Sequence, residues 1–172
     1  MRKRTKLLLA RRGLFLLFIV AAHLLQNTAG FFPEIFGVRA CFLLPLVVCL
    51  SLYERELPGA LYGIFAGALW DSVSGVGDGF NALYLMLMGA ICGILINTRM
   101  RNNMLTACML SAGFHLIYTL LYLVFFLLAE GVDSVGFLFW RYLFPGILYS
   151  ALFTPLLYLA VRGVMQKTRL ER

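Results

Sequence analysis

The sequence has few charged residues for its length, and this scarcity argues against most soluble protein classes. Asp, Glu, Lys and Arg make up 13% of the 172 residues, whereas 62% are apolar and the mean hydropathy is +0.87. A soluble domain contains about 45–50% apolar residues, and a chain of this length has too small an interior to bury the excess. We therefore expect the excess to face lipid. This argues against a cytosolic enzyme, a nucleic-acid-binding module and a secreted disulfide scaffold.

The sequence also lacks the common signatures of catalysis and metal binding. It has no HExxH, GxSxG or GxxxxGK[ST] motif, the patterns of metalloproteases, serine hydrolases and phosphate-binding loops. Its four cysteines lack the two-residue spacing of zinc and redox sites. We expect them to pack as small apolar side chains. The sequence thus predicts no enzyme, no cofactor and no metal site.

Long apolar runs separated by short connections fill almost the whole chain. A helix needs about 20 apolar residues to cross a bilayer. Six segments approach this length, of which the second is short: 13–32, 37–53, 58–76, 80–97, 104–129 and 137–161. We therefore predict an all-α membrane protein in which residues 1–172 form one integral-membrane domain. That domain is a bundle of six transmembrane helices, and the first span is retained rather than cleaved as a signal peptide.

Positively charged residues are distributed unevenly between the two sides of this predicted bundle. With a cytoplasmic N-terminus, thirteen Lys and Arg residues lie in the inner segments, whereas the outer loops contain only Arg39. Because cytoplasmic loops carry an excess of Lys and Arg, this distribution places both termini in the cytoplasm. The basic stretches lack the interleaved aromatic residues on which single-stranded nucleic acid stacks. We therefore expect no nucleic-acid partner.

Small residues recur at intervals of four in three of the predicted spans. Lipid gives helices no hydrophobic reason to associate, and small residues let two backbones approach closely. We interpret the set as helix-packing faces, either within the chain or toward a partner, and favour contacts within the chain. The residues are Gly59, Gly63, Gly67, Gly89, Gly93, Gly146 and Ser150.

Two charged residues lie within predicted spans at similar depth in the outer half. Asp71 precedes the outer end of the third span, and Arg141 follows the outer end of the sixth. A charge in the membrane interior costs about 2.5–3.5 kcal/mol on insertion scales. We expect the two to pair or to share a polar pocket with Asn81. The alternative is that Asp71 caps the end of its own span while Arg141 reaches to the interface. His23 and His115 are interpreted as interhelical hydrogen-bonding groups.

A central motif combines regularly spaced glycines with one aspartate. It reads Gly63-x3-Gly67-x3-Asp71, then Ser74–Gly75, then Gly79–Phe80–Asn81–Ala82–Leu83. This motif resembles the signature of the rod shape-determining MreD family. A closing span from Pro145–Gly146 to Arg162 and the basic N-terminus also fit, so the resemblance covers nearly the whole chain.

The resemblance implies a non-enzymatic component of the bacterial cell-elongation complex in the cytoplasmic (inner) membrane. MreD-like proteins work with the bitopic membrane protein MreC, the actin-like MreB and the peptidoglycan synthesis machinery of the lateral wall. The family also looks similar in fold to the six-helix substrate-binding subunits of energy-coupling-factor vitamin transporters.

A transport subunit of that kind is the alternative function. Such subunits commonly carry Ala-x3-Ala in the first span, a spacing that this chain lacks. A transport subunit would place Trp70, Asp71, Asn81 and Trp140 near an outward-facing pocket with a vitamin-like ligand.

Overall fold

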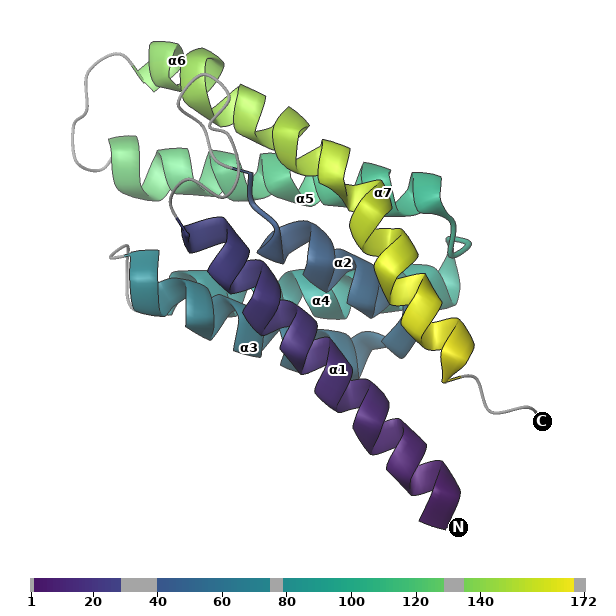
Figure 1. Ribbon diagram of the computed structural model, residues 1–172. Helices are drawn as coiled ribbons and strands as arrows, with labels where there is room; N and C mark the ends of the chain where they lie inside the picture. Colours follow the sequence, from purple (N-terminus) through teal and green to yellow (C-terminus); the bar gives the residue numbers. More distant parts are fainter. Residues whose placement is uncertain (1, 29–39, 75–78, 129–134, 169–172) are drawn as a thin grey trace.

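The structure, a computed structural model, describes residues 2–28, 40–74, 79–128 and 135–168 (Figure 1). These residues contain helices and no strand, which confirms the predicted all-α class for this part of the chain. The elements are α1 (Arg2–Asn27), α2 (Leu43–Glu54), α3 (Glu56–Ser74), α4 (Phe80–Thr98), α5 (Met104–Tyr122), η1 (Leu123–Leu128), α6 (Val135–Leu138), η2 (Phe139–Leu143) and α7 (Phe144–Lys167).

The helices form an elongated bundle in which successive rods run back and forth. α5 continues into the π-helical turn η1, and α6, η2 and α7 form one further rod. The start of α1 and the end of α7 lie at the same end of the bundle (Figure 1). We call this the basic end, because both segments carry Lys and Arg. The opposite end contains the end of α3 and the start of α4.

The helix α2 lies at the centre of the bundle and is much shorter than a membrane span. Its 12 residues extend about 18 Å, whereas a bilayer core is about 30 Å thick. Every residue of α2 except Tyr53 is buried, and the helix contacts α1, α3, α4, α5 and α7. The apolar sequence that suggested a span at 37–53 is therefore also explained by burial within protein. Residues 37–39 lie outside the described part.

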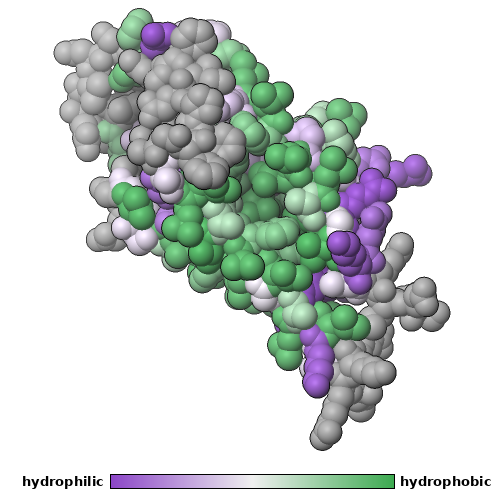
Figure 2. Space-filling view, in the orientation of Figure 1, coloured by the Kyte–Doolittle hydropathy of each residue, from purple (hydrophilic) through white to green (hydrophobic). Residues whose placement is uncertain are grey.

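Within the described part of the chain, four helical stretches are long and apolar enough to cross a membrane. They are Thr5–Asn27, Phe80–Thr98, Met104–Phe126 and Gly136–Lys167. Their outer faces are rich in large apolar side chains, such as Leu87 on α4 and Leu152 on α7, which is 72% exposed. Figure 2 shows hydrophobic residues over much of the middle of the face in view. A polypeptide with such a surface is a membrane protein. The predicted count of six spans remains a prediction, as does the position of the termini.

Prolines alter the helical geometry in the last rod. Pro145 lies in the first turn of α7 and has no N–H to donate to the carbonyl of Arg141. The preceding turn, η2, is π-helical, and the Phe144 amide donates to the carbonyl of Phe139. In this π-helical turn the amide bonds to the carbonyl five residues earlier, and the wider turn accommodates the α-helical bond that Pro145 cannot make. Pro45, by contrast, lies in the first turn of α2, where its missing N–H leaves no gap in the helix.

Candidate functional site: helix interfaces and two polar ends

The antiparallel helices α3 and α4 pack backbone against backbone through glycines. Gly63 faces the backbone of Leu85, and Gly67 faces the backbone of Ala82. A Cβ atom built on either glycine would overlap main-chain atoms of α4, which cannot move aside as a flexible side chain can. These two positions therefore require glycine because of how close the helices come.

The same contact continues toward the basic end. Gly59 and Gly89 lie against each other, and Gly59 also touches Ser51 of α2. Gly93 lies against the backbone of Glu56, where α2 gives way to α3. Five of the six glycines singled out in the sequence thus face α2, α3 or α4 of this same chain, and their faces are not open to a partner.

Gly146 and Ser150 lie on the buried face of α7. The backbone N–H of Cys41, just before α2, donates to Oγ of Ser150 at 2.9 Å. Cys41 and Ser150 are 8% and 1% exposed, so this bond satisfies an amide that would otherwise be buried without a partner. α7 is thereby attached to the start of the central helix.

Asp71 supplies the N-terminal cap of the helix that follows it. Its carboxylate accepts hydrogen bonds from the amides of Asn81 at 3.1 Å and Ala82 at 2.9 Å. The residue at the normal capping position is Gly79, which has no side chain and a φ of +89°. A carboxylate at this position also interacts favourably with the positive end of the helix dipole. Asp71 thus caps α4, whereas the sequence alternative had it capping its own helix.

Arg141 lies in η2 with an exposed side chain. The hydrogen bonds of Asp71 described above connect α3 to α4 and do not involve it. A pairing of Asp71 with Arg141 remains a prediction.

Asn81 is the centre of a buried hydrogen-bond network at this end of the bundle. Its Oδ1 accepts from the Tyr118 hydroxyl at 2.7 Å, and its Nδ2 donates to Oγ of Ser74 at 3.3 Å. Asn81 is 1% exposed, so both ends of its amide are paired as a buried amide requires. Trp70 stacks on Tyr118 with ring centroids 5.2 Å apart. The network ties α3, α4 and α5 together.

Three of the four residues of the predicted ligand pocket make contacts between α3, α4 and α5. Asp71 and Asn81 bind each other's helix, and Trp70 packs on Tyr118. Trp140 lies in η2, is 68% exposed and packs on Phe144. The described contacts of Trp70, Asp71 and Asn81 are thus contacts between helices, and that of Trp140 lies within the last rod.

The two histidines lie on buried helix faces. Nδ2 of Asn27 lies 3.2 Å from Nδ1 of His23, one turn apart on α1, so this contact is within one helix. His115 shares the buried face of α5 with Ser111 and Thr119. No group of three or more His, Cys, Asp or Glu that could hold a metal ion occurs among the described residues.

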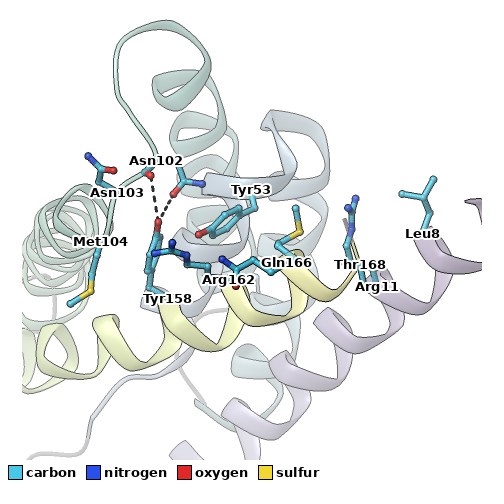
Figure 3. Close-up of a pocket in the computed structure, with 11 residues that line it drawn as sticks. Leu8, Arg11, Tyr53, Asn102, Asn103, Met104, Tyr158, Arg162, Gln166 and Thr168 are labelled. Carbon is cyan, nitrogen blue, oxygen red and sulfur yellow. Dashed lines mark hydrogen bonds between the residues drawn. The ribbon is translucent and has the colours of Figure 1, made fainter. Parts of the chain in front are cut away.

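A cavity of about 880 Å³ opens at the basic end of the bundle, where sequence reasoning had placed no site (Figure 3). α1, the end of α2, the connection before α5 and the last turns of α7 contribute its walls. The lining residues are Leu8, Arg11, Tyr53, Asn102, Asn103, Met104, Tyr158, Arg162, Met165, Gln166 and Thr168. The basic residues among them were interpreted only as topology signals, because segments so distant in the sequence give no sign that they meet.

Three polar contacts hold the walls of this cavity. Nε of Arg11 lies 2.8 Å from Oε1 of Glu54, joining α1 to the end of α2 without the alignment of a hydrogen bond. Asn102 donates from Nδ2 to the carbonyl of Leu52 at 3.0 Å and accepts at Oδ1 from the Tyr158 hydroxyl at 3.1 Å (Figure 3). Asn102 therefore attaches the connection before α5 to both α2 and α7.

Comparison with known families gives one match. The model of the family described as rod shape-determining protein MreD matches residues 8–168, which is most of the chain. A search of the curated proteins finds no match, and neither does a search of the solved structures.

Proposed function

The chain belongs to the rod shape-determining MreD family, and on this basis we propose that it maintains rod shape by binding other membrane proteins side to side. The family implies a membrane component of the rod-shape machinery, and it is a shape-determining family rather than a known enzyme family. The observation that carries the proposal is the match over residues 8–168.

The proposed partners are an MreC-like bitopic protein and, through it, MreB and the wall synthases of the elongation complex. The glycine faces of α3 and α4 are occupied by contacts within the chain. A partner helix would therefore meet the outward-facing apolar surfaces, such as those around Leu87 of α4 or Leu152 of α7. Such a role needs no catalytic group, and we propose that the protein is not an enzyme.

We further propose that the protein is a single multi-pass domain of the bacterial inner membrane with six passes and both termini in the cytoplasm. Two observations support this topology. The first is the excess of Lys and Arg in the segments at the basic end. The second is that α1 begins where α7 ends, as an even number of passes requires (Figure 1). Alkaline phosphatase fused after Lys167 should be inactive, and active phosphatase there would contradict the topology.

Depletion tests the functional proposal directly. In a rod-shaped bacterium that depends on this protein and has no paralogue, depletion should give round, swollen cells. Unchanged rods would contradict the role in shape. Co-purification of an MreC-like protein with the tagged full chain tests the proposed partner, and an exposed-face variant such as Leu87→Trp tests where it binds.

The alternative, a vitamin-binding transport subunit, makes a different prediction. Mass spectrometry of the purified protein would find a stoichiometric vitamin-like ligand. The paired state of Asp71 and Asn81 gives no support to that alternative, because their polar atoms are satisfied within the chain.

A further inference from the structure

We propose that the cavity at the basic end binds the phosphate headgroup of an anionic phospholipid. The cavity volume of about 880 Å³ lies within the range of about 300–1,000 Å³ that is typical of small-molecule sites. The inference rests on the proposed membrane insertion but not on any protein partner.

The charge of the lining favours an anion. Arg11 of α1 and Arg162 of α7 both line the cavity, and the described lining residues include no Asp or Glu. Arg11 is close to the buried carboxylate of Glu54, which offsets part of its charge. Arg162 has an exposed side chain, and no carboxylate is paired with it in the described segments. Arg162 is therefore the cation best placed to bind a ligand.

Neutral hydrogen-bond donors surround the same space. Asn103 and Gln166 line the cavity with exposed side chains, and Tyr53 contributes a hydroxyl beside Arg162 (Figure 3). A guanidinium together with amide donors suits phosphate oxygens, which accept several hydrogen bonds at once. The groups come from three helices and the connection before α5, so the ligand would hold four segments together.

The apolar part of the lining selects a lipid over a soluble phosphate. Leu8 and Met104 line the cavity, and they are 36% and 44% exposed. Their neighbours Leu9 and Leu105 are 63% and 72% exposed on the outer surface of the bundle. The apolar lining thus continues onto the lipid-facing surface, where acyl chains could lie. Basic pockets between helices on the cytoplasmic side are known to bind anionic headgroups.

Native mass spectrometry of the purified full-length protein in detergent tests the inference. We expect more bound phosphatidylglycerol than phosphatidylcholine at equal lipid concentration. Arg162→Gln should reduce the affinity for phosphatidylglycerol about fivefold, because one basic residue contributes about 1 kcal/mol to such binding. Arg162→Lys, which keeps the charge, should restore most of it.

Arg101→Gln is the matched control. Arg101 is exposed in the connection before α5 and does not line the cavity. Its variant should bind phosphatidylglycerol as the unmodified protein does. An equal loss in Arg101→Gln and Arg162→Gln would mean that the lipid responds to net charge only, which would overturn the site.

Two further measurements test the ligand. The first distinguishes a lipid from a soluble phosphate, and the second uses the unmodified protein, so that misfolding of a variant cannot affect it. Glycerol 1-phosphate and inorganic phosphate should not displace the lipid at millimolar concentration, and full displacement would assign the site to a soluble anion. A photoreactive phosphatidylglycerol added to the unmodified protein should label peptides containing Met104 or Met165. Labelling only elsewhere would contradict the proposal. Neither assay includes a protein partner, so a failure here leaves the cell-shape result unaffected.

Discussion

Arg11 and Glu54 form an ion pair that joins α1 to the end of the central helix, with Nε and Oε1 2.8 Å apart. The Glu54 side chain is 5% exposed and that of Arg11 is 17% exposed. The carboxylate of Glu54 is therefore almost fully enclosed by protein, whereas part of the Arg11 side chain remains exposed. A charge so buried is stable in the fold only while its partner remains.

Removal of one partner should therefore cost more than removal of both. Arg11→Leu should lower the free energy of unfolding by about 3 kcal/mol, because the buried carboxylate of Glu54 is left without its counter-charge. The double variant with Glu54→Leu should recover part of that loss. Denaturation by SDS, followed by circular dichroism, measures all three free energies. Additive effects would show that the two residues do not interact.

A methyl group at Gly63 should push α3 away from α4. Gly63→Ala is expected to destabilise the protein by about 1–3 kcal/mol, because the added Cβ overlaps the backbone of Leu85. Gly113→Ala is the control, since a Cβ there meets nothing within 4 Å. Thermal unfolding in detergent should distinguish the two. A Gly63→Ala protein as stable as the control would contradict the close approach.

Loss of the Asp71 carboxylate should loosen the start of α4. Asp71→Ala removes the acceptor for the amides of Asn81 and Ala82 and should cost about 1–2 kcal/mol. Asp71→Asn, which retains one acceptor oxygen, should cost less. Hydrogen exchange of the first turn of α4 measures the effect locally. Ser72→Ala, at an exposed neighbour, should leave that exchange unchanged.

Asn102 should contribute to stability where Asn103 does not. Asn102→Ala removes hydrogen bonds to Leu52 and Tyr158, each contributing about 1 kcal/mol, and frees the connection before α5. Asn103→Ala removes an exposed side chain that makes no capping bond to α5. Limited proteolysis of the connection should be faster in the first variant only. Equal rates would mean that Asn102 does not hold the segment.

The sequence was sufficient to predict the helices but not whether protein or lipid surrounds each one. Apolar runs and short connections predicted the helical class, and the starts of α4 and α5 agree with predicted segments at 80 and 104. Hydropathy alone could not distinguish α2, which is apolar because protein surrounds it, from a helix that lipid surrounds. The shortness of the predicted segment 37–53 was the available signal in the sequence.

The candidate sites were predictable to different degrees. Regular spacing marked Gly63 and Gly67 as contact residues, because a four-residue interval keeps them on one helix face. A lone Asp71 did not reveal its partners, because they are backbone amides, which every residue has. The cavity at the basic end was beyond sequence reasoning, since Arg11 and Arg162 meet there from opposite ends of the chain.

The enclosed position of α2 limits which insertions and deletions of residues the segment can accept. A segment bordered by lipid can gain or lose a residue by tilting, but Leu43–Glu54 has helices on all sides and joins α3 through the single residue Arg55. One inserted residue would rotate Glu54 by about 100° away from Arg11 and shift Ser51 from Gly59. Insertions and deletions should therefore be rarer across this segment than in the other helices that the structure describes.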